Sequence, residues 1–199
     1  MPQFIESIKY ADRELYHINY HTRRFNRTRK KFFGAPPLNL ADLITVPESA
    51  KTGVFKCRVL YGKQITGIQF ISHTFRKINS LKLVEDNSVK YSYKFADREA
   101  LQKLFDLRGE NDDILIVKNG CITDSFSANV IFYDGHGWYT PDTPLLPGTC
   151  RARLLSEGKI SSMRITPDHL SKFISVHLIN AMQDINDSPP IPIKNIASH

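Results

Sequence analysis

Residues 122–132 read Ile-Thr-Asp-Ser-Phe-Ser-Ala-Asn-Val-Ile-Phe, and this stretch decides the fold. It follows Asn119-Gly120, a dipeptide that strongly favours a two-residue hairpin turn. Residues 129–133 form an apolar run that predicts a second strand after the hairpin. Asp124 therefore lies in a short polar stretch between two predicted strands.

Working outward, alternating and apolar runs predict further strands on both sides of this stretch. The predicted strands are residues 4–10, 54–61, 64–72, 78–84, 114–117, 121–123, 129–133 and 138–140, and the predicted helices are residues 19–33, 96–107 and 149–157. This pattern indicates a mixed α/β (α+β) protein. We expect two subdomains, a small N-terminal α/β subdomain at residues 1–86 and a larger C-terminal one at residues 87–199.

Composition indicates an ordinary globular protein. Of its 199 residues, 41% are hydrophobic and 24% are charged, and no apolar run approaches the roughly 20 residues of a membrane helix. Glu6, Lys9 and Asp12 interrupt any signal-peptide core at the N-terminus, so we expect a cytoplasmic protein. The three cysteines have no CxxC spacing and the seven histidines form no ligand pair, so we expect reduced thiols and no metal site.

The net charge of +7 is partly local, because a cluster of basic residues falls within the predicted helix at residues 19–33. The cluster comprises Arg23, Arg24, Arg27, Arg29, Lys30 and Lys31. Such a segment suits a solvated helix face, a phosphate-bearing ligand or nucleic acid. Ile18, Phe25 and Phe32 recur at heptad spacing and predict the buried face, with Arg24 on a different stripe.

Three stretches carry groups that a phosphorylated aldehyde cofactor needs. Lys94 lies among aromatic residues, which can desolvate an amine and make it nucleophilic. Asp124 is an acid that could bond a pyridine nitrogen and keep it protonated. Residues 146–151, Leu-Pro-Gly-Thr-Cys-Arg, form a glycine turn into a helix, whose first N–H groups can bind phosphate. In isolation, a surface lysine, a loop acid and an ordinary helix start are the commoner cases.

The order and spacing of these stretches resemble the class IV aminotransferases, the fold-type IV pyridoxal phosphate (PLP) enzymes. The most specific part is residues 122–132, followed by Tyr139-Thr140-Pro141 and residues 146–151. That family includes branched-chain aminotransferases, D-amino acid aminotransferases and 4-amino-4-deoxychorismate lyases. The resemblance implies PLP as cofactor and the two-subdomain architecture of D-amino acid aminotransferase.

The resemblance also implies roles for individual residues. Lys94 matches the lysine that holds the cofactor in a Schiff base, and Asp124 matches the acid that faces the pyridine nitrogen. Arg24 matches the helix arginine that clamps the cofactor phosphate. The remaining implied cofactor-binding residues are Asn129, the backbone N–H groups of Thr149 and Cys150, and the loop at Asn180-Ala181.

The sequence departs from the family pattern at three places. The acid at position 124 is usually Glu, one methylene longer. Asp97-Arg98 stand where many members have a tyrosine, as in the lyase members. The chain begins directly at the strand of residues 4–10, without the additional N-terminal hairpin of other members, and so resembles a compact variant.

The resemblance implies a 4-amino-4-deoxychorismate lyase most closely. Such an enzyme releases pyruvate and 4-aminobenzoate, a folate precursor, with Lys94 moving the proton at the substrate carbon. The alternative is an aminotransferase acting on branched-chain or D-amino acids. Arg58 and Arg76 are candidates for binding a substrate carboxylate, and each is equally a candidate surface ion-pair partner.

Two further alternatives belong to other classes. One is a basic nucleic-acid-binding protein that uses residues 23–31, in which Arg24 would not differ from its neighbours. The other is a family member that binds PLP without catalysis. For the favoured enzyme we expect a small substrate with amine and carboxylate groups and a homodimer, with neither nucleic acid nor membrane as partner.

Overall fold

The computed structural model describes residues 1–50 and 52–198. The chain divides into two compact units. Unit 1 comprises Met1–Phe75 with Tyr93–Asp97, and unit 2 comprises Arg76–Ser92 with Arg98–His199.

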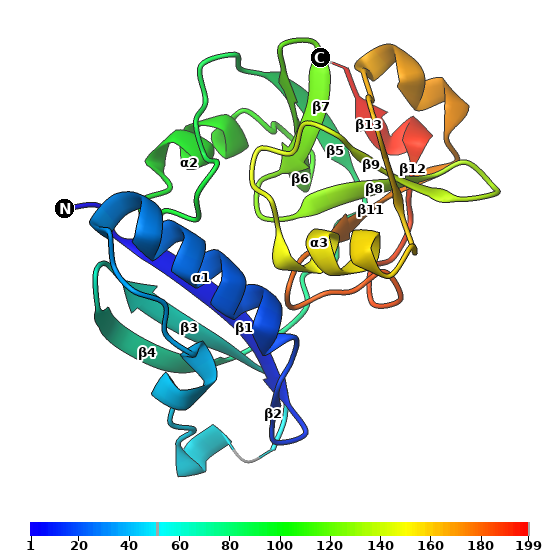
Figure 1. The fold of residues 1–199 in the computed structure, drawn as a ribbon. Helices are drawn as coiled ribbons and strands as arrows, with labels where there is room; N and C mark the ends of the chain where they lie inside the picture. The colour runs from blue at the N-terminus through cyan, green and yellow to red at the C-terminus, as the bar shows by residue number, and fades with distance from the viewer. Residues whose placement is uncertain (51, 199) are drawn as a thin grey trace. The chain divides into compact units, whose positions relative to one another are not determined.

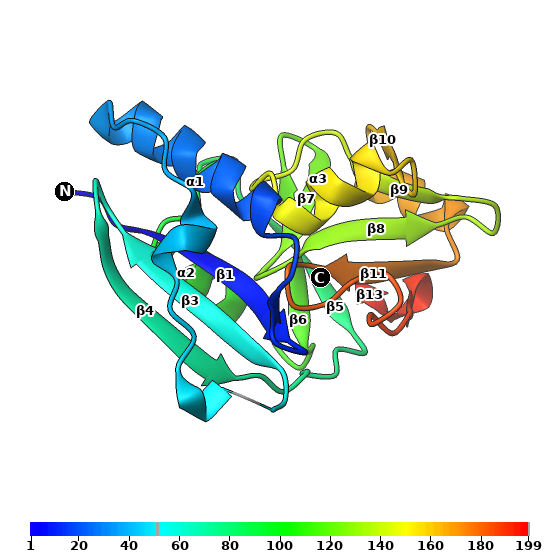
Figure 2. The same ribbon diagram turned by 60° about the horizontal axis from the view of Figure 1, so that its bottom comes forward.

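Unit 1 is an antiparallel sheet with one long helix against it. The strand order is β2 (Glu14–Leu15), β1 (Phe4–Ala11), β3 (Phe55–Tyr61) and β4 (Ile65–Ser72). Helix α1 (Ile18–Phe33) lies along one face of this sheet, and the short helices η1 (Leu40–Leu43) and η2 (Glu48–Ala50) follow it (Figures 1 and 2).

Helix α1 agrees with its predicted range to within one residue. It ends at Gly34, whose φ of 61° is the left-handed conformation that glycine adopts without strain. The predicted heptad face was wrong in part, because Phe32 is 37% exposed. The face that is buried consists of His21, Arg24, Phe25, Thr28 and Arg29.

The segment that carries Lys94 pairs with the start of β1. The Ile5 N–H donates to the Lys94 carbonyl at 2.9 Å, and Phe4 forms an isolated bridge with Phe95. The aromatic rings of Phe4 and Phe95 also pack, with centroids 4.9 Å apart. Lys94 therefore belongs to the smaller unit, whereas the sequence had placed it in the larger one.

Unit 2 is built on an extended mixed sheet. Its path is β10 (Ser161–Met163), β9 (Trp138–Pro141), β8 (Asn129–Tyr133), β7 (Cys121–Ser125), β6 (Asp113–Lys118), β5 (Leu81–Glu85) and β13 (Ile196–Ala197), while β11 (Ser175–Ile179) pairs with β8 and with β12 (Ile191–Pro192). Because β5 pairs in parallel with β6, residues 76–86 join the larger unit, and the boundary expected at residue 86 differs from the observed division.

Helices α2 (Glu99–Asp106), α3 (Thr149–Ser156), η3 (Pro167–Lys172) and η4 (Ile193–Asn195) complete unit 2. The predicted hairpin at Asn119-Gly120 is confirmed, since both residues have positive φ, 51° and 71°. Helix α3 packs through Cys150 and Leu154 on Ile131 of β8. Within the described residues, no helix is both long enough and apolar enough to cross a membrane.

Candidate functional site

The buried carboxylate of Glu6 is the centre of a charged cluster in unit 1. Arg24 holds it with two hydrogen bonds, from Nε to Oε1 at 2.8 Å and from Nη2 to Oε2 at 2.6 Å. His21 Nδ1 lies 2.6 Å from Oε2. Burial alone would raise the pKa of Glu6, but the charge and hydrogen bonds of Arg24 and His21 outweigh it and lower that pKa to about 2. Glu6 is therefore ionised at neutral pH.

This cluster fixes the orientation of the arginine that the sequence singled out. Two hydrogen bonds from Nε and Nη2 to one carboxylate fix the plane of the Arg24 guanidinium. An ionised carboxylate only accepts hydrogen bonds, so His21 must carry its hydrogen on Nδ1. Whether Arg24 clamps a phosphate stays a prediction, but its side chain is held rigidly.

Sequence reasoning missed Glu6 and His21, although the sequence carries a signal for both. Phe4, Glu6 and Ile8 alternate along β1, so Glu6 lies on the same face as two apolar core residues. A charged residue at such a position requires a buried partner. The arginine and histidine three residues apart on the facing helix supply it.

Lys94 lies in the same unit as this cluster. Its side chain is half-buried, with half-buried Tyr93 and Phe95 on either side. Burial lowers the pKa of His21 despite the hydrogen bond with Glu6, and the charges of Arg24 and Lys94 act in the same direction. The structure thus brings two predicted site residues, Arg24 and Lys94, into the electrostatic neighbourhood of one histidine.

Asp124 is a buried acid of unit 2, and its side chain accepts hydrogen bonds from neutral groups. Its Oδ1 accepts from the Asn129 side-chain amide at 2.8 Å, and its Oδ2 accepts from the Leu146 N–H at 2.7 Å. Burial raises the pKa of Asp124 to about 7, against the lowering effect of these hydrogen bonds and of the charge of Arg151. The carboxyl can therefore gain or lose a proton near neutral pH.

Asn129 links this acid to the turn before α3. The same amide nitrogen that donates to Asp124 also donates to the Leu146 carbonyl at 2.8 Å. A Cβ built on Gly148 would stand 2.0 Å from Asn129 Oδ1, so this close approach requires glycine. The motif of Asp124, Asn129 and Gly148 is thus a single packed arrangement.

Thr149 and Cys150 are both buried and form the start of α3, directly after that turn. Helices carry unpaired N–H groups and partial positive charge at this end. The first turn contains no acidic residue that would compete for an anion. These features match the predicted role in binding phosphate.

Asn180 and Ala181 follow the last residue of β11 and begin a tight turn. The Asn180 side-chain oxygen accepts from the Met182 N–H at 2.8 Å, and Asn180 pairs with Gln183 through the backbone. The side chain of Asn180 therefore shapes the turn. A role of the turn in phosphate binding stays a prediction.

The two candidate substrate arginines belong to different units. Arg58 is on β3, where it pairs with Ser7 and so points to the face opposite Glu6, with its Nη1 3.4 Å from Gln69 Oε1. Arg76 belongs to unit 2 and precedes β5. Its Nη2 donates to the Asp112 carbonyl at 2.7 Å.

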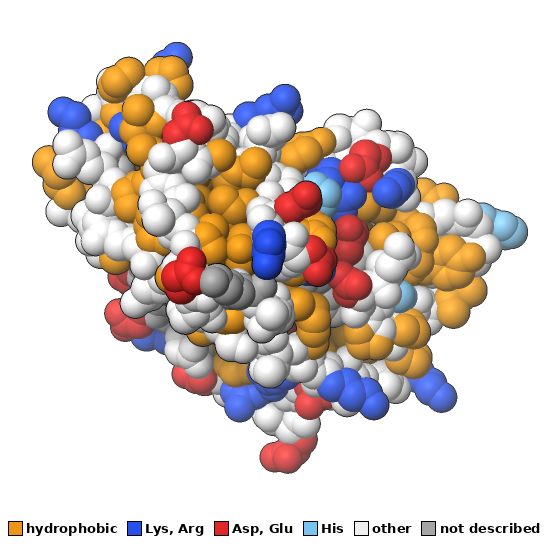
Figure 3. Space-filling model, turned by 90° about the horizontal axis from the view of Figure 1, so that it is seen from below, with side chains coloured by type: hydrophobic (Ala, Val, Ile, Leu, Met, Phe, Trp, Pro, Cys, Tyr) orange, Lys and Arg blue, Asp and Glu red, His pale blue; other side chains and the backbone are white. Residues whose placement is uncertain are grey.

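The basic residues of α1 fall into two groups. Arg24 and Arg29 are buried, and Arg29 donates to the carbonyls of Lys63 and Pro36 at 3.0 and 2.7 Å. The others are exposed: Arg23, Arg27, Lys30 and Lys31. On the face drawn in Figure 3, basic side chains are scattered among acidic and hydrophobic ones. Arg24 is thus distinguished from its neighbours by its surroundings.

The residues present fit a phosphorylated pyridine aldehyde. The neutral partners of Asp124 leave its charge available to a protonated ring nitrogen, which would favour the ionised carboxylate. The start of α3 suits a phosphate, and Lys94 supplies an amine for an aldehyde. Fold and donor set together are those of a PLP-dependent enzyme.

Comparison with known proteins identifies the family. Residues 87–187 match the family model described as "Amino-transferase class IV". An uncharacterised protein of Haemophilus influenzae is 35% identical over 188 residues, which cover 93% of this chain and 100% of that protein. The chain therefore belongs to the class IV aminotransferase family, and it is a PLP-dependent enzyme, as the sequence resemblance implied.

Solved structures confirm the fold-type IV architecture. The structure of a candidate 4-amino-4-deoxychorismate lyase from Haemophilus somnus 129PT is similar, with a TM-score of 0.85 and 31% identity over 93% of this chain and 98% of that one. A candidate amino-acid aminotransferase from Mesorhizobium loti has a TM-score of 0.76 at 19% identity, over 96% and 97% of the two chains. The second likeness concerns the fold alone.

Proposed function

We propose that this enzyme is a 4-amino-4-deoxychorismate lyase, which releases pyruvate and 4-aminobenzoate. The observation that carries the proposal is the 31% identity to the candidate lyase of Haemophilus somnus, because it extends over nearly the full length of both chains. The sequence Asn180-Ala181 and the departure at Asp97-Arg98 support the same choice.

In this proposal Lys94 and Asp124 have separate roles in the reaction. Lys94 would hold the cofactor through its amine and, once the substrate amine has displaced it, would move the proton at the substrate carbon. Asp124 holds a proton on the ring nitrogen, and its own position is fixed by Asn129. Bound PLP supplies the electron-withdrawing ring that makes the substrate carbon acidic.

The phosphate of the cofactor requires separate binding groups. We assign it to Arg24, to the backbone N–H groups of Thr149 and Cys150, and to the turn at Asn180-Ala181. Glu6 serves this assignment indirectly, because it fixes the plane of the Arg24 guanidinium. We further propose that the enzyme acts as a homodimer in the cytoplasm and supplies 4-aminobenzoate for folate synthesis.

An aminotransferase is the second candidate, since the candidate amino-acid aminotransferase of Mesorhizobium loti has a similar fold. It would need the same proton transfer by Lys94, directed to a different carbon. The substrate would again carry an amine and a carboxylate. Substrate identity, and not the cofactor residues, separates the two proposals.

The test is an assay of the purified enzyme, loaded with PLP, on aminodeoxychorismate. We expect 4-aminobenzoate and pyruvate in equal amounts. Transfer of an amino group to 2-oxo acids, with no 4-aminobenzoate formed, would replace the lyase by the aminotransferase.

A matched pair of lysine variants tests the role of Lys94. Borohydride should fix the cofactor covalently to the wild type and to Lys90→Ala. Lys90 is an exposed lysine four positions before Lys94 in the sequence, so it serves as the control. Lys94→Ala should show no covalent fixation, measured by mass spectrometry. Equal labelling of Lys94→Ala would refute its assignment.

A further inference from the structure

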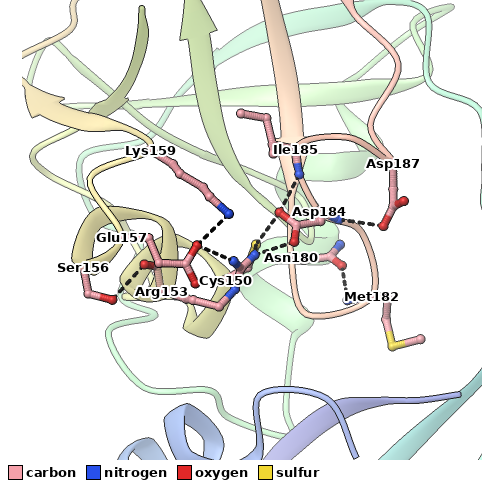
Figure 4. A network of polar contacts seen from close by, with 10 residues as sticks. All are labelled: Cys150, Arg153, Ser156, Glu157, Lys159, Asn180, Met182, Asp184, Ile185 and Asp187. Carbon is pink, nitrogen blue, oxygen red and sulfur yellow. Dashed lines mark hydrogen bonds and ion pairs between the residues drawn. The ribbon is translucent and has the colours of Figure 1, made fainter. Parts of the chain in front are cut away.

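Arg153 on α3 is the buried centre of an ionic cluster whose two carboxylates, Glu157 and Asp184, are partly exposed (Figure 4). Its side chain is 5% exposed. Nη1 donates to Glu157 Oε2 at 2.8 Å, one turn further along the same helix. Nη2 donates to Asp184 Oδ2, which lies on the turn after β11. One guanidinium therefore joins the helix to a distant segment of the chain.

Asp184 organises the turn to which it belongs. Its Oδ1 accepts from the Ile185 N–H at 2.7 Å, and its own N–H donates to Asp187 Oδ2 at 3.2 Å. The Ser188 N–H donates to the Asp184 carbonyl at 3.1 Å, and Ser188 Oγ accepts from the Leu178 N–H of β11 at 3.0 Å. Holding Asp184 thus holds residues 180–188 as a unit.

The same cluster reaches the first turn of α3. The Cys150 sulfur lies 3.9 Å from Arg153 Nη2 and 4.0 Å from Asp184 Oδ1. Cys150 and the turn at Asn180-Ala181 are the two segments of unit 2 assigned to the cofactor phosphate. The ion pair is therefore in contact with one of them and is part of the turn that carries the other.

Stability alone is a weak reason for this arrangement. Burial of the Arg153 guanidinium carries a desolvation cost, and ion pairs with partly exposed carboxylates contribute little to stability. Arg153 Nε is buried without a hydrogen-bond partner among the described residues, so the compensation is incomplete. What the pair does supply is a fixed spacing between two backbone segments.

We propose that the Arg153–Asp184 ion pair is a positioning device that aligns the start of α3 and the Asn180-Ala181 turn for binding the cofactor phosphate. This inference rests on the proposed assignment of those two segments to the phosphate. Arg153 and Asp184 are positioning residues, and neither needs to touch the cofactor. Glu157 binds the same guanidinium from within the helix and leaves the turn untouched.

The test compares the affinities of the apoenzyme for PLP and for pyridoxal, which has the same aldehyde and ring but no phosphate. Both affinities are measured by titration of the absorbance of the bound cofactor, so no turnover is needed. Asp184→Asn should weaken PLP binding by roughly 10- to 100-fold, as loss of outer partners does at metal sites. Its affinity for pyridoxal should stay within about twofold of the wild type, and Glu157→Gln should leave both affinities unchanged.

The outcomes distinguish failure of the positioning role from failure of the assigned phosphate site. If the wild type binds PLP and Asp184→Asn binds it equally well, the positioning role is refuted while the cofactor assignment stands. An equal loss for PLP and pyridoxal would also refute it, because that points to a general structural role. If the wild type prefers pyridoxal or binds neither compound, the assigned phosphate site itself fails.

A second variant keeps the proposal testable if Asp184→Asn fails to fold. Arg153→Lys keeps the positive charge but loses the fork that reaches two carboxylates at once. We expect a smaller loss that is again selective for PLP. Protection of amides 180–188 from hydrogen exchange should fall in both variants, and unchanged protection would contradict the proposal.

Discussion

Glu6 in unit 1 and Asp124 in unit 2 are both fully enclosed carboxyl groups, yet their acidities are shifted in opposite directions. The pKa of Glu6 is lowered to about 2, and the pKa of Asp124 is raised to about 7. Burial raises both values. The difference arises from the partners, because Glu6 faces the cation Arg24 at hydrogen-bond distance and Asp124 faces an amide and a backbone N–H.

This contrast assigns the two acids to different tasks. A carboxylate matched by a guanidinium is a permanent charge, and it serves to hold its partner in place. A buried carboxyl with neutral partners is poised to respond to an incoming positive charge. The first belongs to the scaffold around Arg24, and the second suits a protonated ring nitrogen.

The largest expected effect follows from removing the permanent charge. Glu6→Gln leaves Arg24 buried without its counter-ion, which should lower the free energy of unfolding by about 3–5 kcal/mol. Urea denaturation at neutral pH measures this loss, with Glu14→Gln on exposed β2 as the control. A loss below about 1 kcal/mol would mean that the cluster relaxes and that the contrast is overstated.

The second effect concerns the responsive acid. Asp124→Asn keeps the size of the side chain but cannot hold a proton on the ring nitrogen as a counter-ion. Loss of a charged hydrogen bond is worth about 1.5–3 kcal/mol, so we expect kcat to fall roughly 10- to 100-fold. Steady-state kinetics of the PLP-loaded variant measure it, and a kcat within twofold of the wild type would remove Asp124 from the site.

Counted per pH unit, the smallest effect is the pH dependence of the stability of the apoenzyme. The folded-state pKa of Asp124, about 7, exceeds its ordinary value of 3.8, so its contribution to stability is present below 3.8 and is lost as pH rises to 7. Relative to Asp124→Asn, the wild type should lose up to about 1.4 kcal/mol per pH unit between these values.

Glu6 gives the opposite sign in a lower range. Its contribution is present above 4.5 and is lost only as pH falls toward 2. The difference between the wild type and Glu6→Gln should therefore be flat above about pH 5, where the Asp124→Asn difference is steep. If the two stability differences had the same pH dependence, the pKa values of Glu6 and Asp124 would not be shifted in opposite directions. Unfolding measured at several pH values makes the comparison.

Local signals in the sequence were reliable where a backbone conformation or an ordered motif decides the outcome. The Asn119-Gly120 turn was predicted because few residues adopt positive φ. The run from Asp124 to Gly148 was recognised as one motif, and the close approach of Asn129 to Gly148 shows why its members occur together.

Long-range pairing could not be predicted in the same way. Glu6 and Arg24 are far apart in sequence, and no local pattern states which helix covers which face of β1. The short strands after α3 carry few residues each, so they have too little periodicity to identify. Arg76 is held by the Asp112 carbonyl, a contact that exists only once unit 2 has folded.

The pairing of Lys94 with the first strand has a consequence for how the protein is made. The Ile5 N–H donates to the Lys94 carbonyl, and the Ala96 N–H donates to the Gln3 carbonyl, so unit 1 lacks an element until the ribosome has passed residue 97. By then β5 has also been synthesised, although its partner β6 has not. Lys94, the lysine that we propose bonds the cofactor, thus lies in the last segment of unit 1 to be synthesised. A shorter N-terminal fragment would leave Phe4 without its packing partner Phe95.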